Sequence, residues 1–416
     1  MKRDRGLLMI SCLMCCGLTA AGQSPAQPAP AAQAPVAAPA GRGGGRGGPA
    51  VVSPQIEADG RVTFRLLAPN ATNVTVGGDI NGSLAADPNP TPPPADAPAA
   101  APAGRGGGTP AVMMTKGENG IWSGTTVRRV KPGAWRYTFN VDGATVVDAR
   151  HVNVSPTQTQ VQSVLYVPGD FSETRDVPHG TVGLVRYVAR SLGSARREMY
   201  VYLPPGYEKG TSRYPVLYLI HGGGDTAISW STVGRANNIL DNLLAEKKAL
   251  PMIVVMPSGW TPSGGQVMTA DATRDPFNDE MLTDIIPFVE ANYRTLNSAD
   301  ARALSGLSMG GIQTLNIGLT NLEKFRWLGV FSSGWFPGDL QAFDERHGAA
   351  LKATRTPPRL FWMAHGATDI AKPQSEKVIA MLEKHGMKLV SKETPGGHTW
   401  ANWRDYLRDF APLLFR

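Results

Sequence analysis

One short stretch constrains the fold of this chain more than any other. Residues 304–311 read Leu-Ser-Gly-Leu-Ser-Met-Gly-Gly and contain Gly-x-Ser-x-Gly, with Ser308 at the centre. A strand-like apolar run precedes this motif, and a helix-like run at residues 312–322 follows it. A strand-to-helix turn this tight excludes side chains two positions before and after the serine. The pattern predicts a nucleophile elbow with Ser308 at a strained apex. A Gly/Ser-rich turn without chemistry is the alternative.

The order of elements around Ser308 predicts the fold class. Fully apolar runs at residues 214–220 and 252–256 are typical of buried parallel strands. Further strands are expected at residues 182–188, 198–203, 302–307, 327–331, 360–363 and 388–392, and helices at residues 279–293, 373–385 and 400–414. This alternation predicts a mostly parallel, doubly wound sheet over residues 181–416, with the size of an α/β-hydrolase domain.

A serine nucleophile needs a base within hydrogen-bond reach. In the α/β-hydrolase order, the base follows the acid, which follows the serine. His398 lies in a Gly-rich loop between the last expected strand and the last helix, where this fold presents its base. His385 ends a helix beside a lysine, which favours a solvated side chain, and His365 ends a strand. We therefore predict that His398 is the base; an ordinary loop histidine is the alternative.

The acid that orients the base is expected after the penultimate strand. Asp369 stands there, and this strand end faces the loop of His398. Asp339 and Asp344 follow the preceding strand and are rivals for the role. We predict Asp369 as the acid, with a helix cap or a turn aspartate as the structural alternative.

Two backbone N–H groups are expected to stabilise a developing oxyanion. One belongs to Met309, the residue after the nucleophile. The second comes from the loop after an early apolar strand, here His-Gly-Gly-Gly-Asp at residues 221–225. Glycines allow a close approach to substrate, and position selects Gly223. A Gly-rich strand-to-helix turn is the alternative.

Residues 51–168 have the short, turn-separated strands of an all-β domain. An Asp-Gly pair at residues 142–143 predicts a hairpin turn, and the whole segment predicts an immunoglobulin-like sandwich. The segment resembles family 48 carbohydrate-binding modules and related early-set domains. The matching pieces are Gly-Arg-Val-Thr-Phe-Arg, Pro-Asn-Ala, Gly-Ile-Trp-Ser, Tyr-Thr-Phe-Asn-Val-Asp-Gly and Asp148, which begin at residues 60, 69, 120, 137 and 148. A Pro/Ala/Gly-rich loop at residues 85–111 departs from that pattern.

Residues 181–416 resemble carbohydrate esterase family 1. The matching motifs are Tyr-Leu-Pro-Pro-Gly-Tyr, Tyr-Pro-Val-Leu-Tyr-Leu-Ile-His-Gly, Gly-Leu-Ser-Met-Gly-Gly and Gly-His-Thr-Trp, at residues 202–207, 214–222, 306–311 and 397–400. That family includes feruloyl and acetyl xylan esterases, with esterase D and enterochelin esterases as relatives. The resemblance implies carboxylic-ester hydrolysis by Ser308, Asp369 and His398 through an acyl-enzyme, without metal or cofactor.

The arrangement of a β-domain before an esterase-like domain also resembles that family. This resemblance implies a plant cell-wall polysaccharide, with feruloyl or acetyl esters of xylan as the expected substrate. Trp230, Trp260 and Trp335 lie in or near loops on the expected active-site side and are candidates for contact with an aromatic acyl group. Packing in the core is the alternative for each tryptophan. Two other functions remain open: an enterochelin-type siderophore esterase, and a glycan-binding protein whose hydrolase domain is inactive.

The first 22 residues predict a secretory signal peptide. A basic start precedes a short apolar run and small residues, and all three cysteines lie here, at positions 12, 15 and 16. A lipid anchor on one of these cysteines is the alternative. Residues 23–50 are expected to be a disordered Pro/Ala/Gly/Arg-rich linker, and residues 169–180 a second linker. We expect a secreted or periplasmic protein.

The chain has a formal net charge of +7. Its basic residues do not form the stripe with interleaved aromatic residues that is typical of a nucleic-acid interface, so no nucleic-acid partner is expected.

Overall fold

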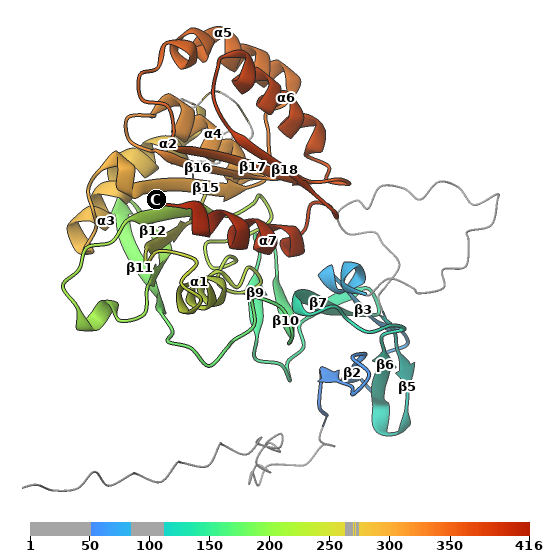
Figure 1. The fold of residues 1–416 in the computed structure, drawn as a ribbon. Helices are drawn as coiled ribbons and strands as arrows, with labels where there is room; N and C mark the ends of the chain where they lie inside the picture. The colour runs from blue at the N-terminus through green and yellow to red at the C-terminus, as the bar shows by residue number, and fades with distance from the viewer. Residues whose placement is uncertain (1–50, 85–111, 263–268, 270, 272–273) are drawn as a thin grey trace, which may run out of the picture. The chain divides into compact units, whose positions relative to one another are not determined.

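An eight-stranded sheet organises the C-terminal part of the chain (Figure 1). The computed structural model describes residues 51–84, 112–262, 269, 271 and 274–416. The strands lie in the order β11 (Thr181–Ala189), β12 (Ala195–Leu203), β14 (Ile253–Pro257), β13 (Val216–Ile220), β15 (Arg302–Leu307), β16 (Trp327–Phe331), β17 (Leu360–Gly366) and β18 (Val390–Thr394). The pairs β11–β12 and β12–β14 are antiparallel, and the strands from β14 to β18 are parallel. This is the mostly parallel sheet that the buried apolar strands predict.

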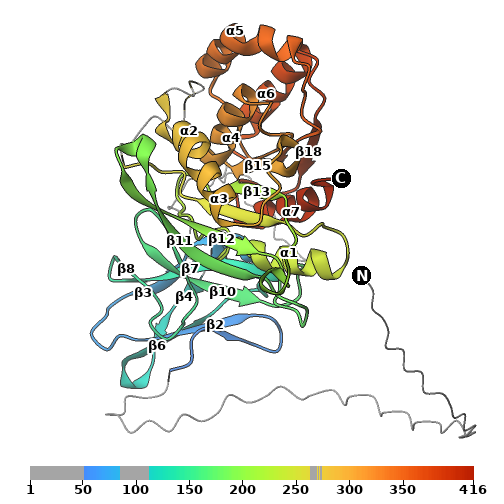
Figure 2. The same ribbon diagram turned by 90° about the vertical axis from the view of Figure 1, so that its left-hand side faces the viewer.

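Helices cover both faces of this sheet, as Figure 1 and Figure 2 show. One face carries α1 (Ala236–Ala245) and α7 (Trp400–Phe410), which share an apolar core with β13, β14 and β16. The other face carries α3 (Ile286–Asn292), α4 (Met309–Thr320), α5 (Pro337–Ala353) and α6 (Lys372–Lys384). The carboxyl ends of β15, β17 and β18 therefore lead into the segments that contain Ser308, Asp369 and His398.

The helix expected at residues 279–293 is divided by a π turn. The segment consists of α2 (Pro276–Glu280), a π-helical turn at Met281–Ile285, and α3. Pro287 lies at the start of α3 and has no N–H to donate to the preceding turn. Loss of that hydrogen bond accounts for a local widening of the helix at this point.

The N-terminal described part contains two antiparallel sheets. One has the order β1 (Gln55–Ile56), β2 (Val62–Leu67), β6 (Ile121–Thr125), β5 (Thr115–Lys116). The other has the order β4 (Val112–Met113), β3 (Val74–Gly77), β7 (Gly133–Val141), β10 (Val161–Val167), β9 (Val154–Pro156), with β8 (Ala144–Val146) paired to β7. Side chains of both sheets, such as Phe64 from β2 and Tyr137 from β7, form one apolar cluster. The two sheets are therefore packed as a sandwich, which we call the β-sandwich (residues 51–84 and 112–167).

The β-sandwich shares buried surface with the hydrolase part. All described residues belong to one compact unit. Ala134 of β7 and Val164 of β10 lie in the same apolar cluster as side chains of α1 and α7. The β-sandwich therefore packs against the α1–α7 side of the large sheet. The predicted signal peptide, its linker and the loop at residues 85–111 lie outside the described residues, and no described helix is long and apolar enough to cross a membrane.

Candidate active site

Ser308 forms a sharp turn between β15 and α4. Its backbone angles are φ 53° and ψ −116°, a conformation that non-glycine residues rarely adopt. A Cβ atom on Gly306 would lie 2.3 Å from the carbonyl oxygen of Gly310, and one on Gly310 would lie 2.6 Å from that of His221. The backbones are too close for side chains at both glycines. The turn thus has the geometry that the motif predicts.

Ser308, His398 and Asp369 form one hydrogen-bonded chain. The Oγ of Ser308 lies 3.0 Å from Nε2 of His398, and Nδ1 of His398 lies 2.8 Å from Oδ1 of Asp369. Burial of Asp369 acts to raise its pKa, but the hydrogen bond and charge of His398, together with hydrogen bonds from Ser332 and the N–H of Ala371, outweigh burial and hold this pKa below its ordinary value. The carboxylate is therefore ionised at neutral pH and can orient the imidazole.

The loops that carry the acid and the base are joined to each other. The N–H of Thr368 donates to the carbonyl oxygen of Gly396 over 2.9 Å, one residue from Asp369 and two from His398. The rings of Trp403 and His398 pack at right angles, with ring centroids 5.1 Å apart and planes at 90°. Both contacts restrict the rotation of the base, so the chain of hydrogen bonds is held before substrate arrives.

The rival residues make other contacts. Asp344 pairs with His385 and with a neighbouring lysine. Asp339 accepts a hydrogen bond from Thr269 over 3.0 Å. His365 lies 3.6 Å from Glu393. Of the three carboxylates considered from the sequence, the structure brings Asp369 to the histidine that contacts Ser308.

The loop after β13, residues 221–232, lies beside the elbow and is called the oxyanion loop below. A Cβ on Gly222 would lie 3.4 Å from Cβ of Ser308, and one on Gly223 would lie 3.7 Å from Cβ of Met309. Among the described residues, neither the N–H of Gly223 nor that of Met309 donates to a protein acceptor. The structure therefore places two available amides beside the serine, as an oxyanion hole requires.

His221 fixes the orientation of the peptide that contains the Gly223 amide. The N–H of Gly259 donates to Nε2 of His221 over 3.1 Å, so the ring proton resides on Nδ1. Nδ1 lies 2.8 Å from the carbonyl oxygen of Gly222 and donates to it. Because a trans peptide directs its C=O and N–H in opposite directions, the N–H of Gly223 points away from His221. Burial lowers the pKa of His221 and favours this neutral ring. Sequence reasoning named this residue only as part of a Gly-rich motif.

The prediction that Trp230 and Trp335 contact substrate is wrong. Both side chains are fully buried. The Nε1–H of Trp335 donates to Asn316 over 2.9 Å inside the core, and Trp230 belongs to the core under α1 and α7. Trp260 is half-buried, and its ring lies 3.9 Å from the Cβ position of Gly223. Trp260 therefore remains a candidate for substrate contact.

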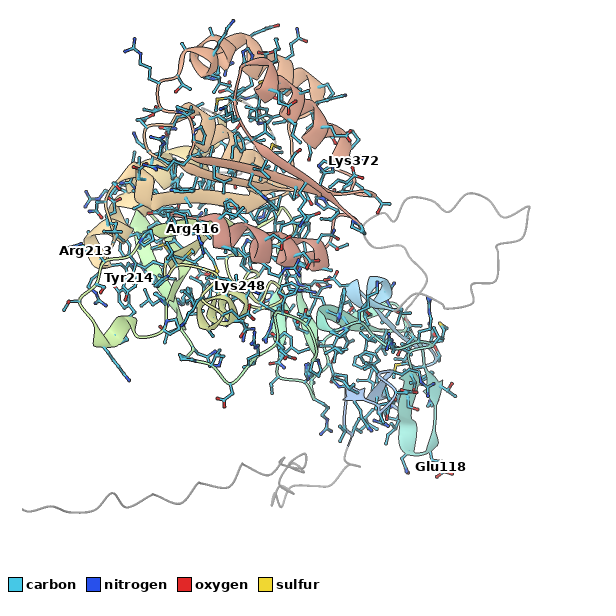
Figure 3. The ribbon with its side chains drawn as sticks, viewed as in Figure 1. Glu118, Arg213, Tyr214, Lys248, Lys372 and Arg416 are labelled. Carbon is cyan, nitrogen blue, oxygen red and sulfur yellow. The ribbon has the colours of Figure 1, made fainter. Side chains whose placement is uncertain are left out.

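One group of side chains among the described residues has metal-ligand spacing. His365, Glu376 and Glu393 place ligand atoms within 4.8 Å of one another. Lys372, which is labelled in Figure 3, lies 2.7 Å from Glu393 and 3.8 Å from Glu376. Its ammonium group already compensates the carboxylates, so we interpret this group as an ion-pair network. The prediction of metal-free chemistry stays a prediction.

Comparisons with known proteins identify proteins that are similar to this chain in sequence and in structure. It is 30% identical over 376 residues to an endo-1,4-beta-xylanase/feruloyl esterase of Xylanibacter ruminicola, covering 87% of this chain and 46% of that protein. The chain thus spans less than half the length of this curated relative. A ferulic acid esterase structure from Anaeromyces mucronatus matches with a TM-score of 0.52 and 23% identity, over 60% of this chain and 96% of that one.

A second solved structure matches a larger part of the chain. The enterobactin esterase of Shigella flexneri superposes with a TM-score of 0.58 and 16% identity, over 86% of this chain and 94% of that one. At these identities, both structures support the α/β-hydrolase fold alone. The family model described as putative esterase matches residues 191–413, more than half of the chain and the part that contains Ser308, Asp369 and His398. The chain therefore belongs to the putative esterase family.

Proposed function

We propose that this protein hydrolyses carboxylic esters through an acyl-enzyme formed on Ser308. The observation that supports this proposal most is the hydrogen-bonded chain from Ser308 through His398 to Asp369, with distances of 3.0 Å and 2.8 Å. A serine with a base in hydrogen-bond contact, and a base oriented by a carboxylate, is an activated nucleophile. Membership of the putative esterase family agrees with this chemistry.

In the acylation half-reaction, Ser308 Oγ attacks the ester carbonyl while Nε2 of His398 accepts its proton. The carbonyl oxygen becomes an oxyanion, to which the amides of Gly223 and Met309 donate. The C–O bond to the alcohol then breaks, and the alcohol takes the proton from His398. In other serine hydrolases the loss of one oxyanion donor lowers turnover by about 10²–10³-fold.

In the deacylation half-reaction, water replaces the departed alcohol. Nε2 of His398 accepts a proton from the attacking water, and the same two amides stabilise the second oxyanion. The bond between the acyl carbon and Ser308 Oγ breaks, and the serine regains its proton from His398. The products are a carboxylic acid and the free enzyme, and Asp369 remains a carboxylate throughout.

The proposed substrate is a feruloyl or acetyl ester of plant cell-wall xylan. The name of the Xylanibacter ruminicola relative joins xylanase and feruloyl esterase activities, which supports this class. The half-buried Trp260 beside Gly223 offers an aromatic surface next to the proposed oxyanion hole. Secretion or export to the periplasm, which the first 22 residues predict, would suit a polymeric substrate.

A siderophore ester is the second candidate. The enterobactin esterase of Shigella flexneri matches 86% of this chain, a share that extends beyond the hydrolase part.

The relationship of the β-sandwich to family 48 carbohydrate-binding modules stays a prediction. Its six aromatic side chains in the described residues are buried or half-buried, which disfavours a flat stacking platform for sugars: Phe64, Trp122, Trp135, Tyr137, Phe139 and Tyr166.

A side-by-side assay tests these proposals. Wild-type protein and the Ser308→Ala variant would be given methyl ferulate, 4-nitrophenyl acetate, acetylated xylan and enterochelin. We expect turnover of the ferulate or acetate esters by the wild type and almost none by Ser308→Ala. Release of acetate alone would exclude feruloyl specificity, and preferential turnover of enterochelin would favour the siderophore ester. An absence of turnover on all four would overturn the esterase proposal and favour a glycan-binding protein.

A further inference from the structure

We propose that the β-sandwich positions the oxyanion hole, and that Arg136 is the positioning residue through which it acts. The proposal rests on the proposed function, because it takes Gly223 as an oxyanion donor. It assigns to the β-sandwich a role in catalysis that is separate from any binding of glycans. Three sets of contacts between the β-sandwich and the oxyanion loop support it.

The first contact is a buried ion pair. Arg136 lies on β7, and its Nη1 is 2.7 Å from Oδ1 of Asp225 in the oxyanion loop. The two side chains are only 7% and 8% exposed. Asp225 follows Gly223 by two residues, and its own N–H donates to the carbonyl oxygen of Gly222 over 3.0 Å. Arg136 therefore holds a residue that fixes the Gly222–Gly223 peptide, whose N–H is the proposed donor.

The second set of contacts comes from the end of β9 and the segment after it. The N–H of Gln158 donates to the carbonyl oxygen of Gly224 over 3.2 Å, and its Nε2 donates to that of Asp225 over 2.9 Å. The hydroxyl of Thr226 donates to the carbonyl oxygen of Pro156 over 3.2 Å. Three consecutive residues after Gly223 are thus hydrogen-bonded to the β-sandwich.

The third set of contacts extends from Arg136 along the oxyanion loop and to α7, the helix after His398. Nη2 of Arg136 donates to the hydroxyl of Ser229 over 3.1 Å and to that of Ser155 over 2.8 Å. The hydroxyl of Ser155 in turn shares a hydrogen bond of 2.8 Å with that of Thr232. The guanidinium also lies over the ring of Trp400, 5.6 Å from its centroid. Trp400 begins α7, two residues after His398, so one arginine contacts both the oxyanion loop and the helix that follows the base.

A second arginine makes the reciprocal connection. Arg404 of α7 is 2% exposed, and its Nη1 donates to the carbonyl oxygens of Ala134 in the β-sandwich and Val233 after the oxyanion loop, over 2.9 Å and 3.1 Å. Its guanidinium lies 5.5 Å from the ring centroid of Trp135. Because each side contributes a buried arginine, a shift of the β-sandwich would also move the oxyanion loop at Asp225 and Ser229 and the chain at Val233 just after it.

Substitutions at the ion pair test the proposal. We expect Arg136→Met to lower kcat on 4-nitrophenyl acetate about 10- to 100-fold, below the full loss of one donor, with KM within threefold of wild type. Arg136→Met combined with Asp225→Asn should retain more turnover than Arg136→Met alone, because no buried charge is left unpaired. The matched control is Tyr137→Phe, which removes a 2.9 Å hydrogen bond to Asp148 inside the β-sandwich. We expect its kcat to stay within twofold of wild type.

Amide hydrogen exchange tests the same contacts without turnover. At a temperature well below each melting point, we expect the amides of Asp225 and Thr226, which donate to the carbonyl oxygen of Gly222 and to Ser229, to exchange at least tenfold faster in Arg136→Met than in wild type. Their exchange should be unchanged in Tyr137→Phe. If Arg136→Met does not fold, Gln158→Ala removes the bond to Asp225 without exposing a buried charge. That variant should lower kcat three- to tenfold at constant KM and speed exchange at the same amides.

Three results would overturn the proposal. They are unchanged kcat and exchange in the folded variants, a loss that appears in KM rather than kcat, and equal losses in Arg136→Met and Tyr137→Phe. If the wild-type protein turns over no ester, the proposed function fails. The exchange experiment then still decides whether the β-sandwich holds the oxyanion loop.

Discussion

Asp369 presents one carboxylate oxygen to two donors. Its Oδ1 is the partner of Nδ1 of His398 at 2.8 Å and accepts from the N–H of Ala371 at 2.8 Å. We predict that Asp369→Asn lowers kcat by about 10⁴-fold, the effect of the same change in another serine hydrolase, because an amide stabilises the wrong imidazole tautomer. Steady-state kinetics measure this loss. Asp344→Asn, which alters the pair with His385, is the control and should stay within twofold of wild type; equal losses would contradict our assignment of the acid.

His221 links stability to pH. Burial lowers its pKa from the ordinary value of 6.5, so near that pH the unfolded chain binds more protons than the folded protein. The stability that the neutral ring contributes is present above pH 6.5 and is lost as the pH falls toward the lower folded pKa. We predict that His221→Gln has a flatter dependence of Tm on pH between pH 5 and 7 than wild type. Parallel curves in thermal scans would refute this coupling.

The residues of the hydrogen-bonded chain could be foreseen because the chemistry and the chain order restrict the choices. The glycine spacing singled out Ser308, and the loop after the last strand singled out His398. The sequence could not decide whether Trp230 and Trp335 contact substrate or pack in the core, because a loop sequence has no periodicity that separates inward from outward side chains. The role of Arg136 could not be predicted either, because its partner Asp225 is distant along the chain and no local sequence pattern links the two.

At the scale of elements, the elbow depends on the close approach of β15, α4 and the end of β13. A Cβ on Gly310 would lie 2.6 Å from the carbonyl oxygen of His221 and 2.8 Å from that of Ile220. We predict that Gly310→Ala destabilises the protein by about 1–3 kcal/mol, because backbone must move to admit the methyl group. Chemical denaturation measures this change.

Gly224→Ala is the matched control for that prediction. No atom lies within 4 Å of the Cβ position of Gly224, although it belongs to the adjacent oxyanion loop. Its stability should stay within about 0.5 kcal/mol of wild type. Similar destabilisation of both variants would mean that close packing at the elbow is not what requires glycine at position 310.

The expected strands of the large sheet are present, but two helices were not foreseen. Seventeen residues form α5, yet only Phe343, Gly348 and Leu351 are buried, so its sequence lacks a continuous apolar stripe. The residue before α1, Arg235, has φ 54° and makes no side-chain cap, so no start signal marks this helix. Both helices depend on tertiary packing that sequence patterns do not encode locally. By contrast, β13, β14 and β16 were predictable because each is a short continuous apolar run, typical of a buried parallel strand.

At the scale of the whole molecule, the β-sandwich and the hydrolase part should unfold together. They share an apolar cluster and two buried arginines, Arg136 and Arg404, whose partners lie across the contact. Separating the parts would leave charged groups buried or newly unpaired, which costs free energy. We predict one calorimetric transition, with a calorimetric enthalpy equal to the van't Hoff enthalpy. Two resolved transitions would contradict this coupling.

The position of Gln158 and Arg136 against residues 224–232 limits how such proteins can be recombined. A chimera that joins a foreign β-sandwich to this hydrolase part would bring unmatched side chains to a turn only one residue beyond Gly223. Exchange of modules should therefore succeed when the segment from Gly224 to Thr232 travels with its own β-sandwich. The junction of such a chimera should therefore lie inside the hydrolase part, because a junction in the linker between the two parts would separate this segment from its own β-sandwich.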